Sequence, residues 1–376
     1  MSPCFNSCLR LLREGVEDQV FPSAAWAIGQ GRQVFCSGVV GNRTLHPAAE
    51  PADRDTLYDL ASLSKLISTT MVALRLIEEG RLLLTDPLSR YFTAEELDGA
   101  PAGRAEVTVF SLMTHTSGLT PHIALWNQLP EPEDHAVAHA ILTSAPFCRP
   151  GEQVYYSCMG YILLQKILER LTGQSLADLA RLYVFGPLGM RHTGYTPRED
   201  NVATTEFSSL RQMYIKGEVH DENAHFLGGV SGNAGVFAPL DDMINFAVMC
   251  ATHGNLPGIA FGTGEGPFLS RRTFDLAVQD YTPGLAESRG LGFQLKPPLP
   301  RLSAMGDLMA EGSYGHTGFT GTSLYVDSQT GVWGVLLTNA VHFGRDKTAF
   351  FRYRRLFYNA MMAGFGLTEA NETVIG

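Results

Sequence analysis

The chain of 376 residues is poor in charged side chains, which make up only 18% of it, whereas hydrophobic residues make up 45%. An average domain has roughly 25% charged residues. We therefore expect an extensive core and no long disordered segment. The net charge is −10, and the only basic cluster is the short RYRR stretch at 352–355. This acidic balance argues against nucleic acid and anionic membranes as partners.

Long hydrophobic runs and paired cysteines are also missing. No apolar run reaches the roughly 18 residues that a membrane-spanning helix needs, and Arg10, Arg13 and Glu14 interrupt the N-terminus before a signal-peptide core can form. We therefore expect a cytoplasmic protein without a membrane partner. The six cysteines form no CxxC pair and no dense framework, so the sequence predicts free thiols.

Lysine is scarce as well, since the chain has five, and only one of them completes a Ser-x-x-Lys pattern. That pattern, Ser62 and Lys65, begins the segment 59–80, which we expect to be a helix ended by Gly80. The apolar face that predicts this helix has residues at helical spacing, namely Leu63, Leu66, Ile67, Thr70, Met71, Leu74 and Ile77.

A serine and a lysine in this arrangement suit nucleophilic catalysis. Residues three positions apart lie on the same helix face, one turn apart, so the Lys65 amine is within reach of the Ser62 hydroxyl. The positive end of the helix dipole and partial burial both disfavour an ammonium. We therefore expect Lys65 to be neutral near neutral pH and able to accept the serine proton.

The remaining segments predict a sheet made from both chain ends. Strand patterns at 23–30 and 33–41 indicate a hairpin, and a turn at 327–331 joins two further strands. The other expected elements are helices at 5–18, 159–171, 176–184, 241–252 and 345–362 and a strand at 289–295. This order predicts an α+β fold: an antiparallel sheet of five or more strands, flanked by terminal helices, with a mainly helical insertion.

We expect one catalytic domain over 1–376. Its sheet lobe would combine residues 1–58 with 286–376, and its helical lobe would span 59–285. The Ser62 helix would then begin at the seam between the lobes, where pockets form. The glycine-rich stretch 254–267 lacks the flanking strand and helix of a phosphate-binding loop, so we interpret it as a connection.

Two further motifs stand at suitable distances from Ser62. The first is Tyr156-Ser157-Cys158, before a predicted helix, and the second is His316-Thr317-Gly318, at the start of a strand. With the Ser-x-x-Lys pattern they resemble, in order and spacing, the three boxes of the serine β-lactamase and penicillin-binding-protein family. The nearest pattern is the class C branch with its DD-peptidase-like and esterase-like relatives. Flanking segments that carry the same resemblance are 114–119, 150–157, 228–237 and 315–327.

The resemblance implies a β-lactamase/transpeptidase-like fold and an acyl-enzyme on Ser62. Lys65 and Tyr156 would share the proton transfers, with the identity of the general base left open. His316 would supply positive charge near the phenol together with Lys65. Water would then release the acyl group, with the phenol or the amine as base.

The same resemblance implies the groups that bind the substrate. The backbone N–H groups of Ser62 and Phe319 would hold the oxyanion. Thr317, Gly318 and Cys158 would contact the substrate, and Gly318 would let it approach the strand closely.

Two departures from the family pattern favour esters or simple amides as substrates. His316 stands where the family has lysine, and a neutral imidazole attracts a carboxylate less strongly. Cys158 stands where the family has asparagine, and a thiol cannot hold an amide carbonyl. The alternatives are a β-lactamase or D-amino-acid peptidase, and a sensor or scaffold that is acylated without turnover.

Other chemistries are less well supported. The pairs His135/His139 and His220/His225 have spacings of possible metal ligands, but the glutamate of HExxH is missing and Ala136 stands in its place. No serine lies in Gly-x-Ser-x-Gly, which excludes an α/β-hydrolase. We expect no metal and no cofactor, and a small acyl compound as the partner. The sequence does not predict an oligomeric state.

Overall fold

The computed structural model describes residues 5–198, 200–255 and 267–373, with side chains up to Gly366. Its centre is a seven-stranded antiparallel sheet in the order β3-β2-β1-β12-β11-β10-β9. The predicted hairpin and the predicted 327–331 turn are both present, so both chain ends build the sheet as expected. The strands are β1 Ser23–Gln30, β2 Gln33–Thr44, β3 Glu50–Pro51, β9 Gln294–Leu295, β10 Tyr314–Thr317, β11 Ser323–Val326 and β12 Val332–Thr338.

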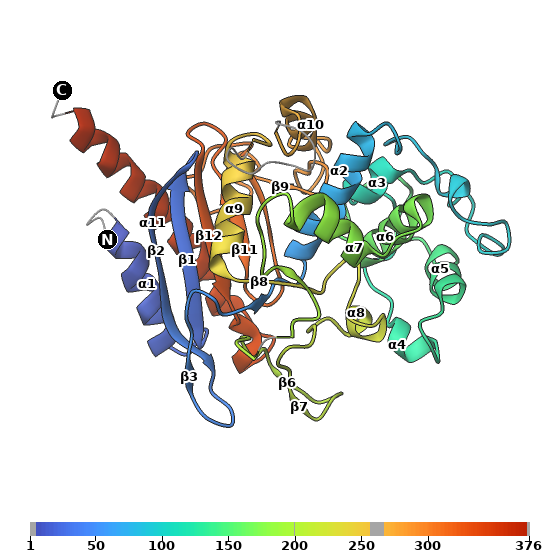
Figure 1. The fold of residues 1–376 in the computed structure, drawn as a ribbon. Coiled ribbons are helices and arrows are strands. Elements are labelled where there is room, and N and C mark those ends of the chain that lie inside the picture. Colours follow the sequence, from blue (N-terminus) through green and yellow to red (C-terminus); the bar gives the residue numbers. More distant parts are fainter. Residues whose placement is uncertain (1–4, 199, 256–266, 374–376) are drawn as a thin grey trace.

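Helices cover both faces of this sheet (Figure 1). The terminal helices α1 (Asn6–Glu17) and α11 (Thr348–Thr373) pack together on one face, where Trp26 meets Phe357 edge-on. Helix α9 (Leu240–Ala251) lies on the other face against β12 and β1. Although α9 belongs to the segment assigned to the helical lobe, it packs on the sheet. The division into a sheet lobe (1–58 and 286–376) and a helical lobe (59–285) therefore stays a prediction.

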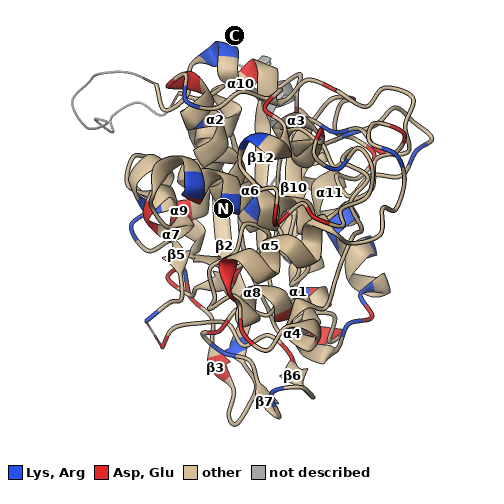
Figure 2. Ribbon diagram, turned by 90° about the vertical axis from the view of Figure 1, so that its right-hand side faces the viewer, with Lys and Arg blue, Asp and Glu red and all other residues tan. Residues whose placement is uncertain are grey.

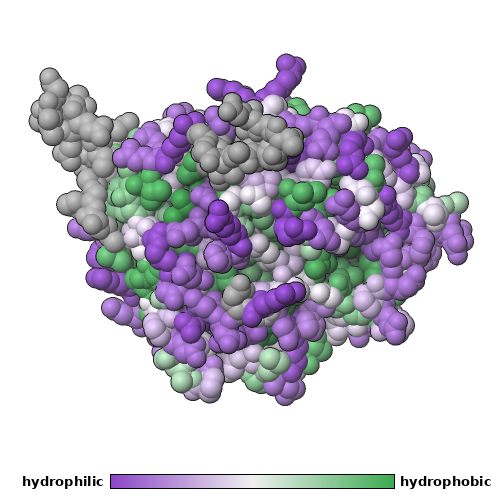
Figure 3. Space-filling model, viewed as in Figure 1, coloured by the Kyte–Doolittle hydropathy of each residue, from purple (hydrophilic) through white to green (hydrophobic). Residues whose placement is uncertain are grey.

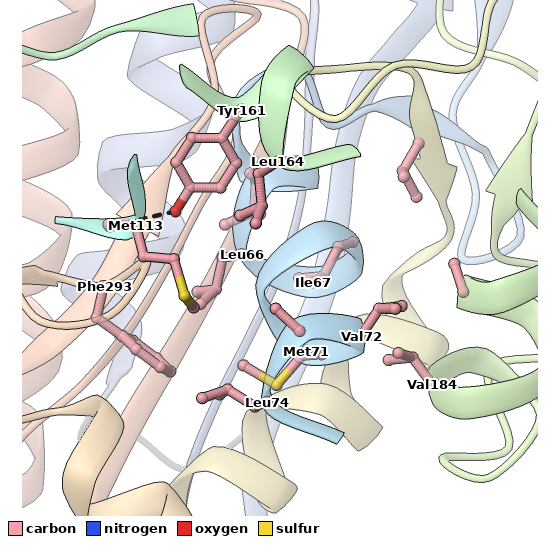
Figure 4. Packing of buried hydrophobic residues seen from close by; sticks show 14 of the residues in the cluster. Leu66, Ile67, Met71, Val72, Leu74, Met113, Tyr161, Leu164, Val184 and Phe293 are labelled. Carbon is pink, nitrogen blue, oxygen red and sulfur yellow. Dashed lines mark hydrogen bonds between the residues drawn. The ribbon is translucent and has the colours of Figure 1, made fainter. Parts of the chain in front are cut away.

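The helix that follows Ser62 is the centre of the helical part. A π-helical segment, η2 (Lys65–Thr70), runs into α2 (Met71–Glu78). Figure 4 shows its apolar side chains packed among residues of neighbouring elements, and these residues are fully buried. The surrounding helices are α3 Val109–Met113, α4 Leu125–Gln128, α5 Asp134–Leu142, α6 Cys158–Thr172, α7 Leu176–Ala180 with η4 Arg181–Phe185, α8 Glu222–Phe226 and α10 Arg271–Ala277. Short 3₁₀ turns are η3 Leu88–Arg90 and η5 Ala340–Phe343.

Two expectations for this region need correction. The stretch expected to be mainly helical also contains short strands, because loops between its helices pair with one another: β4 Tyr58–Asp59, β5 Gly194–Tyr195, β6 Phe207–Ser208, β7 Met213–Tyr214 and β8 Val236–Ala238. The helix also begins later than residue 59. Asp59 is in β4, and Ala61 has a φ of +45°, so the helical turns begin only after Ser62.

The surface is mixed in character. Figure 2 shows basic and acidic segments interspersed along a ribbon that is mostly uncharged, and Figure 3 shows hydrophobic atoms scattered among hydrophilic ones on the visible face. Within the described ranges, none of the helices has the length and hydropathy required to cross a bilayer. The five cysteines in those ranges are free thiols, as predicted, and the 254–267 connection lies mostly outside them.

Candidate active site

Ser62 follows a turn in which Ala61 has a positive φ, and its hydroxyl contacts the Lys65 amine. The turn is held by the carboxylate of Asp59, which accepts a hydrogen bond from the Ala61 N–H at 2.8 Å. The Lys65 amine donates to the Ser62 hydroxyl oxygen at 3.0 Å and to the carbonyl oxygen of Asn233 at 2.9 Å. Lys65 is fully buried, whereas Ser62 is partly exposed. The predicted serine–amine contact is therefore present.

The charge state of Lys65 differs from the expectation. Burial alone would lower the pKa of Lys65, but its attraction to Cys158 and Tyr156 outweighs burial and raises that pKa above its usual value. The expected neutral amine is therefore wrong for the resting site. An ammonium is satisfied here because the Ser62 and Asn233 oxygens accept from it.

Tyr156 lies beside this amine, just before α6. The Lys65 amine is 4.8 Å from the centre of its ring, and the phenol oxygen is buried with no hydrogen-bond partner in the described part of the chain. Burial raises the pKa of Tyr156, although the Lys65 charge opposes this. The ring is flanked by His115 at 4.5 Å, whose Nδ1 accepts from the Ser157 N–H at 3.2 Å. His115 thus ties the second box to the 114–119 segment.

Cys158, the first residue of α6, contacts the amine rather than the open cavity. Its sulfur lies 3.5 Å from Lys65 Nζ. Burial raises the pKa of Cys158, and Lys65 partly offsets this. A partly exposed thiol therefore contacts the ammonium where the family has an amide.

His316 is buried in β10 and is neutral. Its Nδ1 donates to the Thr317 carbonyl oxygen at 2.7 Å, and its Nε2 has no partner among the described residues. Burial, followed by the charges of Arg289 and Lys65, lowers the pKa of His316 to about 3. Its ring lies 6.0 Å from the ring of Tyr156. His316 is thus close to the phenol, but it does not carry the positive charge that the resemblance implied.

The third box is tied to the turn that precedes Ser62. The Thr320 hydroxyl donates to the Asp59 carbonyl at 2.6 Å, and the Thr322 hydroxyl donates to the Leu60 carbonyl at 3.1 Å. A Cβ on Gly318 would stand 2.2 Å from the Leu60 carbonyl oxygen, so only glycine fits there. Gly318 is therefore required by this close backbone approach.

An open cavity of about 310 Å³ joins these groups. Its polar lining includes the Ser62 hydroxyl and three cations, Arg289, Lys347 and Arg354, with Glu287 paired to Arg289. The guanidinium of Arg289 lies 5.5 Å from the centre of the Tyr156 ring. The other lining residues are Tyr156, Gln294, His316, Thr317, Gly318, Phe319 and Phe351.

Sequence reasoning missed several residues of this site. Asn233 lies within the 228–237 segment that carried the resemblance, but nothing singled out its carbonyl as a partner of Lys65. Arg289 and Lys347 lie outside every motif. Only the fold brings them to the cavity.

The histidine pairs lie elsewhere. A second cavity, of about 580 Å³, is lined by His135 and His139 with four carboxylates, and His135 pairs with Glu96 at 3.0 Å. His220 lies 3.0 Å from Glu206, whereas His225 pairs with Glu218. Among the described residues, no three His, Cys, Asp or Glu side chains are grouped so that they would hold a metal ion. The contact between Ser62 and Lys65 therefore lies at the cavity of about 310 Å³ and not at the one lined by His135 and His139.

Comparison with known proteins agrees with this geometry. The family model described as Beta-lactamase matches residues 9–358. The chain belongs to the beta-lactamase family. It is 29% identical over 317 residues to a putative D-alanyl-D-alanine carboxypeptidase of Escherichia coli (strain K12), covering 77% of this chain and 70% of that protein.

Two other proteins are similar to this chain over most of their length. An N-acetylmuramyl-L-alanine amidase of Bacillus subtilis (strain 168) is 29% identical over 357 residues, covering 86% of this chain and 78% of the amidase. The solved structure of EstCE1, a hydrolase with promiscuous acyltransferase activity, superposes with a TM-score of 0.72 at 21% identity, covering 96% and 98% of the two chains. The predicted family and fold are thus confirmed, and the chain is a beta-lactamase-family serine hydrolase.

Proposed function

We propose that Ser62 attacks a carboxylic ester or simple amide and forms an acyl-enzyme. The observation that carries this proposal is the 3.0 Å contact between the Lys65 amine and the Ser62 hydroxyl oxygen, at the wall of an open cavity. A positioned amine and an accessible hydroxyl are the parts that nucleophilic catalysis needs.

In the proposed mechanism, Lys65 and Tyr156 share one mobile proton. The active form has lost one proton relative to the ammonium–phenol pair, and the attraction between the two groups favours an ammonium beside a phenolate. The phenolate takes the proton of Ser62 as its oxygen bonds to the acyl carbon, while the ammonium stabilises the serine oxygen. Tyr156 then returns the proton to the leaving alcohol or amine.

The oxyanion is held between two backbone N–H groups. Neither the Ser62 N–H nor the Phe319 N–H has a partner within the described residues, so both are available. Such donors are most effective when they are fixed before the reaction. The hydroxyl-to-carbonyl bonds of Thr320 and Thr322 supply that fixation. In the second half-reaction the Tyr156 phenolate takes a proton from a water molecule as the water oxygen bonds to the acyl carbon, and it returns that proton to the Ser62 oxygen as the carboxylic acid leaves.

Esters and simple amides are favoured because the usual polar contacts to a peptide are weakened. His316 is uncharged, and Cys158 lies against Lys65 instead of offering an amide. The structural likeness to EstCE1, a hydrolase, is consistent with this choice. A permanently acylated sensor is the outcome if the acyl group is never released.

D-amino-acid peptidase or carboxypeptidase activity is the second candidate. Arg289, Lys347 and Arg354 line the cavity, so positive charge is present even though His316 is neutral. The relatives named carboxypeptidase and amidase point to the same substrate class.

The test is turnover of p-nitrophenyl esters and of D-alanyl-D-alanine peptides. We expect wild-type protein to release nitrophenol in a burst followed by steady turnover. Ser62→Ala should abolish both phases, and Ser209→Ala, at an exposed position, should change neither. Near-normal ester hydrolysis by Ser62→Ala would contradict the proposal, and a faster peptide than ester reaction would favour the second candidate.

A further inference from the structure

Lys347 is a buried lysine that no motif marks. It lies immediately before α11, is only 7% exposed and contributes to the wall of the Ser62 cavity. Its amine donates to the carbonyl oxygen of Phe319 at 2.5 Å and lies 3.2 Å from the centre of the Phe319 ring. A second ring, that of Phe351, is 5.6 Å from the amine. Lys347 is therefore packed onto the residue that follows the third box.

The segment around Phe319 is fixed on both sides of this residue. Gly318 donates from its N–H to the Thr322 carbonyl at 2.7 Å, and Thr320 is bonded to Asp59. Phe319 itself has one polar partner in the described part of the chain, the Lys347 amine. The peptide that carries the Phe319 N–H is held at its other end, where the Gly318 carbonyl accepts from the Gly321 N–H at 3.1 Å. The Lys347 bond holds the next peptide, which carries the Phe319 carbonyl, so the two bonds together fix the backbone on both sides of the Phe319 Cα.

We propose that Lys347 is a positioning residue for the oxyanion hole: by holding both the carbonyl and the ring of Phe319, its ammonium keeps this residue in the backbone conformation in which the Phe319 N–H faces the acyl oxygen. The inference rests on the proposed function, since it requires an oxyanion next to Ser62. A positive charge in the wall of this cavity also favours the negative charge that develops on the acyl oxygen. Lys347 thus acts through Phe319 and does not touch the reacting bond.

The groups around Lys347 make its hydrogen bond to the Phe319 carbonyl dependent on pH. No carboxylate of the described residues lies within ion-pair distance of the amine, and the nearby Arg345 is bonded to Glu206 and Glu222. Burial, then the charges of Arg354 and Arg345, lower the pKa of Lys347 to about 7, with Glu206 acting in the opposite sense. His220 stacks on Phe319 at 5.6 Å. The charge-assisted bond is therefore present below this pKa and weakens as the pH rises through it.

The experiment compares kcat and KM for a neutral p-nitrophenyl ester across neutral pH in three variants. Lys347→Met removes the donor and should lower kcat by about 10-fold, with KM changed by less than about 2-fold. Lys347→Arg keeps a donor and a fixed charge, so it should restore most of kcat and remove the fall in kcat above neutral pH. Arg352→Gln, at an exposed position of α11, is the matched control and should behave as wild type.

A wild-type kcat and pH profile in Lys347→Met would overturn the inference, as would a loss confined to KM. If Lys347→Met does not fold, the test is the comparison of the pH dependence of kcat in wild type and in Lys347→Arg. Identical pH dependence in the two proteins would contradict the positioning role of Lys347. Both results presuppose turnover that depends on Ser62. Activity that survives Ser62→Ala would instead refute the proposed function, so the two failures are distinguishable.

Discussion

The Lys65 amine lies 3.0 Å from the Ser62 hydroxyl oxygen, at the start of a helix whose first turns are π-wound. π-helical turns occur often at functional sites, because they shift side chains relative to an α-helix. Here the unusual turns follow a residue with positive φ, Ala61, so the backbone is distorted on both sides of Ser62. The distortion is stabilised by the core around η2 and α2 (Figure 4).

Tyr156→Phe should separate activity from stability. The Tyr156 hydroxyl is buried without a well-aligned hydrogen bond in the described residues, although Lys65 and Ser62 lie close enough to lower its pKa, so its removal should change the melting temperature little. If Tyr156 moves the serine proton, kcat should fall by about 100-fold or more.

Tyr161→Phe, in the helix α6 that follows Tyr156, is the matched control. Its hydroxyl contacts Thr70 at 3.2 Å and donates to the Met113 carbonyl at 3.4 Å, so its loss should cost about 1 kcal/mol of unfolding free energy with most activity retained. A Tyr156→Phe enzyme with wild-type kcat would remove Tyr156 from the mechanism.

His316→Lys should destabilise the protein although the family has lysine there. The new ammonium would be buried near Arg289 and Lys65, whose charges already lower the pKa of His316. We expect a loss of about 3 kcal/mol at neutral pH, measured by urea denaturation. The loss should shrink as the pH approaches the pKa of an unfolded lysine, because the charged form is the costly one. His316→Gln is the uncharged control. If His316→Lys were as stable as His316→Gln, a positive charge at position 316 would not be destabilising, which would contradict this prediction.

The ion pair between Glu206 and Arg345 should make stability depend on acid pH. Burial raises the pKa of Glu206, but hydrogen bonds from His220 and Arg345 outweigh it and lower that pKa to about 2. A depressed carboxylate pKa stabilises the fold above the unfolded value and stops doing so as the pH falls through the folded value.

Arg345→Gln should therefore cost about 1–2 kcal/mol at neutral pH, since Arg345 is itself half exposed, and the deficit should fade as the pH falls from about 4.5 to about 2. Arg32→Gln, in an exposed turn, serves as the control in urea denaturation. A deficit that is equal at both pH limits would count against the ion pair.

Cys158 should be protected by acylation of the site. Its sulfur lies 3.5 Å from Lys65 Nζ, so an acyl group on Ser62 would restrict access to it. After treatment with an acylating inhibitor, labelling of Cys158 by N-ethylmaleimide should fall several-fold. Cys148, which is also a partly exposed free thiol but has Glu152 rather than Lys65 as its charged neighbour, should label as before. Unchanged labelling of Cys158 would place it away from the substrate.

Local signals predicted much of the fold. Gly80 has a positive φ at the end of the helix that it was expected to end, because only glycine adopts that conformation without strain. The alternating patterns of 23–30 and 33–41 predicted the hairpin. The later start of the Ser62 helix was not predictable, since it depends on β4 pairing with β8, far along the chain.

The residues of the candidate site also fall into those that local sequence predicted and those that only the tertiary structure places there. Ser62 immediately precedes the helical turns that contain Lys65, three positions on, so their contact followed from sequence spacing. Arg289 approaches from a loop beside β9, and Asn233 approaches from the loop before β8. Their places depend on the tertiary structure, and the charge states of Lys65 and His316 depend on it too. Sequence spacing therefore predicted the contact between Ser62 and Lys65 but not its electrostatic surroundings.

The most direct test of the central claim is the intact mass of the protein after brief exposure to a p-nitrophenyl ester. Wild-type protein should gain the mass of one acyl group, located on the peptide that contains Ser62, and should lose it again with time, whereas Ser62→Ala should gain nothing. An equal adduct on Ser62→Ala, or an adduct on another residue of the wild type, would contradict the account.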